Sequence, residues 1–158
     1  MTETACCRSA SAEETAALGE KLAALLEPGD VVVLDGDLGA GKTQFSKGVA
    51  AGLGVAEEVT SPTFPILLEY EGSRLPLFHF DLYRLSHEDE LEDVDFFGVL
   101  ESDGVSLVEW GGKFPDALPE ERLDVFIRLG ADGGRVLELA GVGRRGAELA
   151  RAFEGRLA

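Results

Sequence analysis

The sequence predicts an α/β fold in which a mixed, partly antiparallel sheet is flanked by helices. The apolar run V-V-V-L at residues 31–34 is typical of a strand that is buried on both faces. A glycine-rich loop and a helical pattern follow at once, which indicates a strand–loop–helix unit with parallel pairing. Turn sequences at residues 71–73 and 132–134 separate later pairs of extended segments and indicate antiparallel hairpins.

The first helix is predicted by Ser11, which forms a capping box with Glu14 three residues later. Pro28-Gly29 is expected to stop this helix. Its buried face is expected to carry four leucines: Leu18, Leu22, Leu25 and Leu26.

The helix after the glycine-rich loop is indicated by Phe45, Val49 and Leu53 at helical spacing, with Gly54 as its C-cap. Ser86, with Asp89 three residues later, predicts the start of an acidic, solvated helix over residues 88–94. The remaining predicted elements are extended segments at 66–70, 75–83, 105–109, 123–129 and 136–139, and a last helix carrying Leu149, Phe153 and Leu157.

Length and composition indicate one globular domain. The chain has 158 residues, enough for one α/β domain and too few for two. We expect residues 1–10 to form a disordered lead and residues 11–158 a single nucleotide-binding domain. The adjacent cysteines Cys6 and Cys7 form no metal-binding pattern and cannot cross-link a core, which favours a reducing, cytoplasmic location. No apolar run reaches the roughly 18 residues that span a bilayer.

The chain is strongly acidic, with a formal net charge of −16. Phosphate backbones repel such a protein, so direct and unaided binding to nucleic acid is disfavoured. A role in RNA biology would have to pass through a basic partner, although solubility alone can also explain the acidity.

The strongest functional signal is the sequence G-D-L-G-A-G-K-T at residues 36–43, which matches the phosphate-binding pattern G-x-x-x-x-G-K-[ST]. Its glycines allow backbone N–H groups to point at one anion, and the following helix adds its N-terminal dipole. Lys42 is expected to reach the β- and γ-phosphates, and the Thr43 hydroxyl to ligate Mg²⁺. The alternative is a glycine-rich turn that binds no ligand, and such a turn would need neither the lysine nor the threonine. The predicted loop residues are Gly36, Asp37, Leu38, Gly39, Ala40, Gly41, Lys42 and Thr43.

Two carboxylates end other predicted strands, where nucleotide hydrolases often hold an acid close to the metal. Asp81 follows an aromatic strand and Glu109 follows an apolar one, although either could simply be a solvated strand end. His79 lies two residues before Asp81 and shares its face of the strand. It could position water or phosphate, or it could be a core histidine satisfied by a neighbour.

Ser61 and Thr63 lie in a proline-braced loop where many nucleotide hydrolases hold a γ-phosphate-sensing hydroxyl. The alternative is a proline turn with local backbone hydrogen bonds. The chain contains no asparagine, which argues against the Asn-Lys-x-Asp motif of GTPases. Its arginines are scattered along the chain and form no substrate-clamping set, which makes a small-metabolite kinase a weaker interpretation.

Four segments, taken together and in order, resemble the TsaE (YjeE) family, bacterial ATPases needed for the threonylcarbamoyladenosine modification of tRNA. The resemblance covers nearly the whole chain. The segments are the loop at 36–43, S-P-T-F at 61–64, H-F-D-L-Y-R-L at 79–85 and V-E-W at 108–110.

This resemblance implies a three-layer fold of the P-loop NTPase type and a slow ATPase that uses ATP and Mg²⁺. It assigns catalytic roles to Lys42, Asp81 and Glu109, and metal binding to Thr43 and Glu109. It places Thr63 in a switch-like segment, and Ser11 and Arg135 near the base. Gln44 departs from the second hydroxyl residue of many members, while Thr43 is intact.

The resemblance also implies a role beside TsaB and TsaD, of which TsaD transfers the threonylcarbamoyl group to tRNA. The chain would then contact tRNA only through that complex, act away from membranes, and be monomeric when alone. Two other classes stay open: a small-metabolite kinase, and a nucleotide-gated binding module that does not hydrolyse.

Overall fold

The computed structural model describes residues 2–37, 41–60 and 66–157. Leu38, Gly39, Ala40, Ser61 and Thr63, all singled out above, lie outside the described residues. The strands are β1 (Thr2–Ser9), β2 (Val31–Gly36), β3 (Leu67–Tyr70), β4 (Leu77–Asp81), β5 (Val105–Glu109), β6 (Arg122–Leu129) and β7 (Arg135–Val142). The helices are α1 (Ala12–Ala23), α2 (Lys42–Gly52), α3 (Glu90–Asp93), α4 (Phe96–Leu100) and α5 (Gly143–Gly155), with 3₁₀ turns η1 (Gly111–Lys113) and η2 (Pro115–Ala117).

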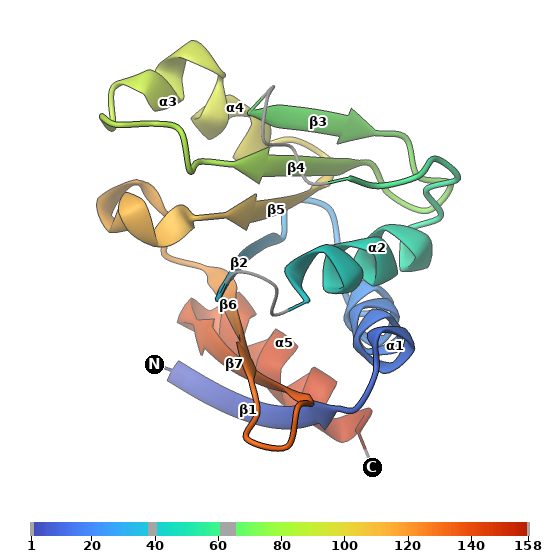
Figure 1. The fold of residues 1–158 in the computed structure, drawn as a ribbon. Coiled ribbons are helices and arrows are strands. Elements are labelled where there is room, and N and C mark those ends of the chain that lie inside the picture. The colour runs from blue at the N-terminus through green and yellow to red at the C-terminus, as the bar shows by residue number, and fades with distance from the viewer. Residues whose placement is uncertain (1, 38–40, 61–65, 158) are drawn as a thin grey trace.

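The seven strands form one sheet in the order β1-β7-β6-β2-β5-β4-β3 (Figure 1). The central strands β6, β2, β5 and β4 are parallel to one another. The edges are antiparallel, because β7 and β1 extend one side and β3 the other. This confirms the predicted mixed sheet, with parallel pairing around the glycine-rich loop and hairpins towards the edges.

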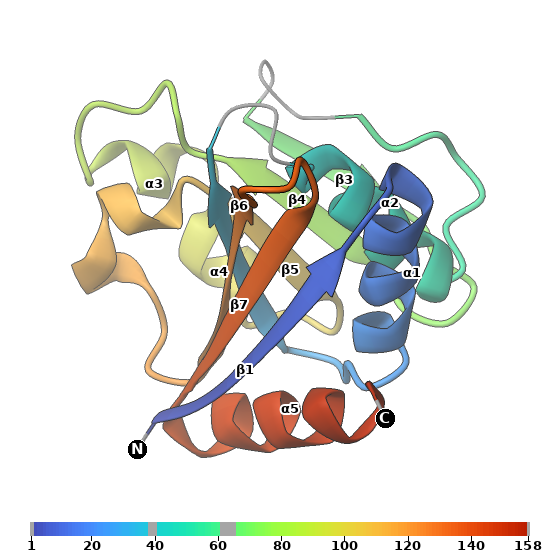
Figure 2. The same cartoon turned by 60° about the horizontal axis from the view of Figure 1, so that its bottom comes forward.

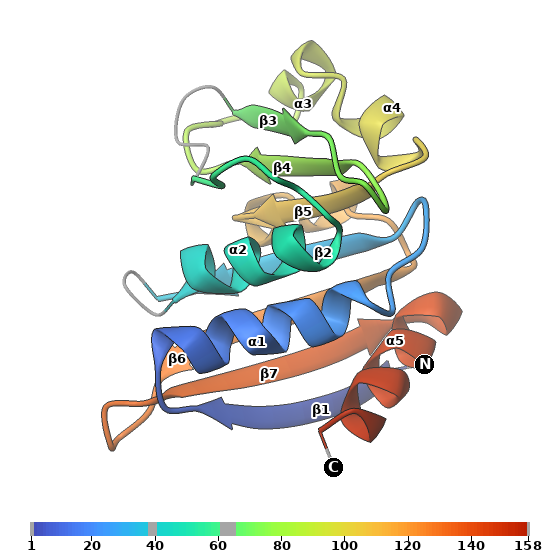
Figure 3. The same ribbon diagram turned by 90° about the vertical axis from the view of Figure 1, so that its right-hand side faces the viewer.

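Helices cover the two faces of this sheet unequally. One core cluster joins α1, α2 and α5 to the sheet and includes Leu22, Phe45 and Phe153. These three helices lie in front of the sheet in Figure 3. A smaller cluster around Phe80 and Phe96 lies on the other face, under α3, α4 and the 3₁₀ turns. The sheet is therefore flanked by helices as predicted, but the second layer is short. Within the described residues, no helix combines the length and apolar character that a membrane span requires.

The predicted capping signals operate at the first two helices. The Ser11 hydroxyl accepts a hydrogen bond from the Glu14 amide at 3.1 Å, which confirms the N-cap of α1. This helix ends at Ala23, earlier than the predicted stop at Pro28-Gly29. Leu53 is the C-cap of α2, and Gly54 follows with a φ of +85°, the left-handed geometry that closes a helix.

Two glycines allow α1 and α2 to pack at backbone contact. A Cβ built on Gly48 would lie 1.9 Å from the carbonyl oxygen of Ala16, and one built on Gly19 would lie 2.4 Å from that of Phe45. Figure 2 shows the two helices side by side along the same part of the sheet. This contact fixes the position of α2, whose first turn carries Lys42 and Thr43.

The disordered lead expected at residues 1–10 is wrong for most of that segment. Thr2–Ser9 form β1, which pairs with β7 in unbroken antiparallel register (Figure 2). Alternate residues face the core, since Ala5 is buried and Cys7 is half-buried, whereas Thr4 and Cys6 are exposed. The inward residues are small, so the hydrophobic alternation is too weak to stand out in the sequence.

The acidic helix expected over residues 88–94 is shorter and starts differently. Only Glu90–Asp93 are helical, and Asp89 makes no side-chain cap. The predicted Ser86 cap is absent; the amides of Ser86 and His87 donate to Glu90 Oε1 instead. Leu91 is fully buried, so this segment is also an anchor to the core.

Two element ends differ from the pattern of the rest of their element. Leu123, Val125 and Ile127 of β6 are buried, whereas Leu129 at its end is exposed. Leu157 lies beyond the end of α5 and is partly buried against the main core.

Candidate nucleotide and metal site

The candidate site lies where the carboxyl ends of β2, β5 and β4 meet (Figure 1). These strands are parallel neighbours, so the residues that follow them gather at one edge of the sheet. The chain leaves β2 at Gly36 and enters α2 at Lys42, which places the predicted phosphate loop between strand and helix. Asp81 ends β4 and Glu109 ends β5, as predicted.

The described part of the loop shows why glycine is needed at its two ends. A Cβ on Gly36 would lie 2.3 Å from the Ile127 carbonyl oxygen on the neighbouring strand. Gly41 has a φ of +107°, a left-handed conformation that favours glycine, and its carbonyl accepts from the Phe45 amide. Asp37 and Thr43 are exposed at the two sides of the loop.

Lys42 is held at the loop without a carboxylate partner among its described contacts. Its ammonium donates to the Gly36 carbonyl oxygen at 3.1 Å and lies 4.8 Å from the centre of the Trp110 ring. Both contacts are with electron-rich groups that a phosphate oxygen can replace. The charge of Lys42 is thus available to an anion in the loop.

Asp81 and Glu109 are neighbours across β4 and β5 and are both buried, at 6% and 3% exposure. They share the face that carries Leu77 and Leu107, which pack in the same cluster as α2. Burial raises the pKa of Asp81; a hydrogen bond from the Tyr83 amide opposes the rise, and the nearby charge of Glu109 adds to it. Two adjacent buried carboxylates repel each other, and a cation beside them would relieve that repulsion.

His79 is a buried histidine satisfied by a neighbour, one of its two predicted alternatives. That neighbour is Glu109: His79 Nε2 lies 2.6 Å from Glu109 Oε2, and His79 is 1% exposed. The buried partner of His79 is thus one of the two predicted site acids.

Trp110 and Asp35 also meet at this site, although neither was predicted as a site residue. Trp110 has a left-handed φ of +62°, and its amide donates to Asp35 Oδ1 at 3.1 Å. Its ring contacts both the Lys42 ammonium and the Tyr83 ring, whose centre is 4.9 Å away. Burial is the main cause that raises the pKa of Asp35. No local pattern in the sequence links position 35 to position 110.

The residues present fit a magnesium ion. Thr43, Asp81 and Glu109 offer hard oxygen donors, and the buried carboxylate pair calls for positive charge. The described residues contain no group of three or more His, Cys, Asp or Glu side chains able to enclose a metal. Mg²⁺ is commonly bound by one or two protein oxygens together with phosphates and water, so a sparse ligand set agrees with it.

The structure also brings together Ser11 and Arg135, the two residues expected near the base. Both line a pocket of about 200 Å³ that continues to Gly41 and Gln44 at the start of α2. They come from opposite ends of the chain and meet because β1 pairs with β7, which puts the start of α1 beside the β6–β7 turn.

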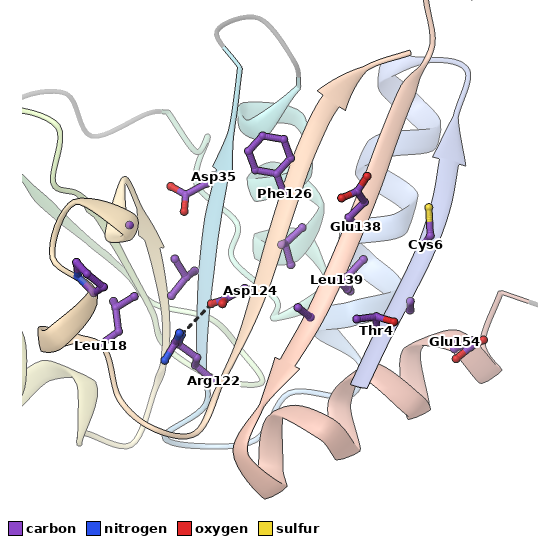
Figure 4. Close-up of a pocket in the computed structure, with 16 residues that line it drawn as sticks. Thr4, Cys6, Asp35, Leu118, Arg122, Asp124, Phe126, Glu138, Leu139 and Glu154 are labelled. Atoms are coloured by element: carbon purple, nitrogen blue, oxygen red, sulfur yellow. Dashed lines mark hydrogen bonds and ion pairs between the residues drawn. The ribbon is translucent and has the colours of Figure 1, made fainter. Parts of the chain in front are cut away.

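A second and wider pocket, of about 860 Å³, lies on the open face of the sheet over β2, β6, β7 and β1 (Figure 4). It is lined by Asp35, Phe126 and Glu138, and by an ion pair of 2.9 Å between Arg122 and Asp124. None of the predicted site residues lines it. Asp35, which accepts from the Trp110 amide, is the residue that connects this open face to the site at the strand ends.

Comparison with known proteins agrees with this geometry. A family model described as "Threonylcarbamoyl adenosine biosynthesis protein TsaE" matches residues 9–136. A Bacillus subtilis protein named "tRNA threonylcarbamoyladenosine biosynthesis protein TsaE" is 46% identical over 138 residues, covering 87% of this chain and 86% of the relative. A Treponema pallidum protein of the same name is 46% identical over 134 residues, covering 85% and 98%.

The fold has a close counterpart among solved structures. The crystal structure of Bacillus subtilis YdiB superimposes with a TM-score of 0.81 at 37% sequence identity, covering 100% of this chain and 99% of YdiB. Sequence and fold thus agree over most of the chain, and the protein belongs to the TsaE family of threonylcarbamoyl adenosine biosynthesis proteins.

Proposed function

We propose that this protein binds and hydrolyses ATP with Mg²⁺ and acts on the TsaB–TsaD complex in tRNA threonylcarbamoyladenosine modification. The observation that carries the proposal is the meeting of the Lys42 loop with the buried pair Asp81 and Glu109 at one edge of the parallel strands. Family membership supplies the tRNA-modification context.

Each residue of this edge has a role in the proposed hydrolysis. Lys42 exchanges its contact with the Gly36 carbonyl for phosphate oxygens and neutralises charge on the transferred phosphoryl group. Thr43 and Glu109 hold Mg²⁺, which when bound supplies charge neutralisation at the phosphates. Asp81 accepts a hydrogen bond from water and orients it. Lys42, Asp81 and Glu109 are thus the proposed catalytic residues.

The base end of the nucleotide is proposed to lie in the pocket formed by Ser11, Gly41 and Arg135. Support comes from its continuity with the start of α2 and from its polar lining. Arg135 already donates to the Gly133 carbonyl oxygen at 2.9 Å, so its guanidinium is held at the rim. Thr63, outside the described residues, remains the proposed γ-phosphate sensor.

Partner dependence is also part of the proposal. A cationic group from a partner would complete the site and stabilise the charge of the transition state, as arginine fingers do in related hydrolases. The net charge of −16 disfavours direct contact with tRNA. We therefore propose a cytoplasmic protein, monomeric alone, that reaches tRNA through TsaB and TsaD.

The test is ATP hydrolysis by this protein alone and with TsaB and TsaD from the same source, with Lys42→Ala as control. Partner-stimulated turnover that disappears in Lys42→Ala supports the proposal. Rapid turnover that is independent of partners, or none in either condition, contradicts it. Glu109→Ala should lower turnover more than nucleotide affinity; wild-type turnover in that variant would remove Glu109 from the mechanism.

The same experiment separates the two other classes. A small-metabolite kinase would form ADP only with an added acceptor and without a protein partner. A nucleotide-gated binding module would bind ATP and change its affinity for TsaB–TsaD without turnover.

A further inference from the structure

His79 is the described side chain that contacts a carboxylate of the proposed metal site. It is 1% exposed, and its Nε2 lies 2.6 Å from Glu109 Oε2. A deprotonated carboxylate, the form that binds a metal ion, only accepts hydrogen bonds, so in that form His79 Nε2 is the donor. The contact is a short hydrogen bond between two buried side chains of the adjacent strands β4 and β5.

The hydrogen bond divides the two oxygens of Glu109 between two tasks. Oε2 is engaged by His79, whereas no hydrogen bond from a described residue reaches Oε1. A free carboxylate on this strand end could rotate about its last bond and offer either oxygen. With Oε2 engaged, that rotation is restricted and one defined oxygen is left towards the site.

Strand register makes this arrangement specific. His79 pairs with Leu107 and Asp81 pairs with Glu109, so His79 approaches Glu109 diagonally from two residue pairs deeper in the sheet, on the same face. The support therefore comes from within the sheet, and the side of Glu109 towards the strand end is left to ligands. Nδ1 of His79 is buried without a described hydrogen-bond partner, so its ring is oriented by the Glu109 contact.

We infer that His79 is a positioning residue, which holds Glu109 in the orientation that serves Mg²⁺ and does not itself touch metal or nucleotide. The inference rests on the proposed function, since it assigns the residue that supports a metal ligand of that same site. Hydrogen-bond partners of metal ligands fix ligand orientation, and their loss commonly lowers metal affinity or activity by about 10- to 100-fold.

The test compares His79→Leu, which removes the donor at similar size, with His79→Gln, whose amide can donate from a position close to Nε2. Two quantities are measured in the complex with TsaB and TsaD: the Mg²⁺ concentration for half-maximal ATP hydrolysis, and kcat. A third is measured without metal, namely ADP affinity from the fluorescence of Trp110, the sole tryptophan of the chain. Ser106→Ala is the matched control, because Ser106 is a buried polar residue of β5 with no described partner.

We expect His79→Leu to raise the required Mg²⁺ concentration about 10- to 100-fold, with metal-free ADP affinity within about 3-fold of wild type. His79→Gln should recover most of the Mg²⁺ response, and Ser106→Ala should leave it unchanged. A wild-type Mg²⁺ response in a folded His79→Leu protein would overturn the inference. So would a parallel loss of thermal stability and metal-free ADP binding, which marks a merely structural role.

Imidazole NMR of the wild-type protein provides a readout that needs no substitution. The chain has two histidines, and the exposed His87 is an internal reference for His79. Adding Mg²⁺ to the ADP complex should shift the His79 signals and leave His87 in place; unchanged His79 signals would count against the inference. Absence of any Mg²⁺ effect on wild-type nucleotide binding and turnover would instead defeat the proposed function itself.

Discussion

The contact between α1 and α2 sets the position of the phosphate loop, and Gly48→Ala tests it directly. The added Cβ would lie 1.9 Å from the Ala16 carbonyl oxygen, whereas real Cβ contacts essentially never fall below 3.0 Å. The clash is with backbone in the middle of a helix, so no side chain can rotate away. Relief requires α1 and α2 to separate by about 1 Å.

The expected loss of stability follows from two opposing effects. Overpacking costs about 1–3 kcal/mol, and a backbone clash this short belongs at the upper end. Alanine is intrinsically about 1 kcal/mol better than glycine inside a helix, which offsets part of the cost. The net loss is about 2 kcal/mol, a factor of about 30 in the ratio of folded to unfolded protein.

Turnover of ATP should fall by more than this loss of stability suggests, because α2 begins with Lys42 and Thr43. A displacement of about 1 Å can cost on the order of 100-fold in turnover. Urea denaturation gives the stability, and partner-stimulated ATP hydrolysis gives the turnover. Gly155→Ala is the control, because a Cβ there meets nothing within 4 Å, and this variant should match or exceed wild-type stability. If Gly48→Ala is as stable as Gly155→Ala, the close packing of α1 on α2 is refuted.

Three further predictions follow from particular contacts. Ser11→Ala should lower the free energy of unfolding by about 1 kcal/mol, because the Glu14 amide loses its cap, while Ser11→Asp should retain the cap in urea denaturation. Iodoacetamide at pH 8 should modify the exposed Cys6 well before Cys7, whose thiol pKa is raised to about 11 by burial; equal rates in peptide mass spectrometry would contradict the pairing of β1. Burial holds the pKa of Asp81 above its unfolded value of 3.8, so this group should cost stability as pH rises from about 4 through the folded pKa. Asp81→Asn should therefore flatten that part of the stability–pH curve and raise the melting temperature at pH 7 while lowering turnover; an unchanged curve would show that Asp81 is not the group responsible.

Local patterns in the sequence were sufficient for the elements that carry the chemistry. The strand at 31–34, the glycine-rich loop and the helix after it are encoded within one short segment, where apolar runs and glycine spacing act over a few residues. The positions of Asp81 and Glu109 at strand ends could be predicted for the same reason. The Ser11 cap depends on Glu14 three residues away, so it too was visible.

Elements without a strong local signal were not predictable. The strand β1 is stabilised by its pairing with β7, more than 120 residues later in the chain, and its small inward side chains give almost no alternation. The short helix α3 lies within the predicted range 88–94 but is shorter, and the buried Leu91 anchors it to the core where its acidic residues had indicated a solvated surface.

The sequence by itself thus determined the glycine-rich loop pattern, the two acids at strand ends and the family resemblance. The tertiary structure alone decided which groups surround them. His79 meets Glu109, Asp35 meets the Trp110 amide, and Ser11 meets Arg135 only when strands far apart in sequence become neighbours. Sheet order and register are set by the packing of the whole core, and no local spacing of residues encodes such pairs.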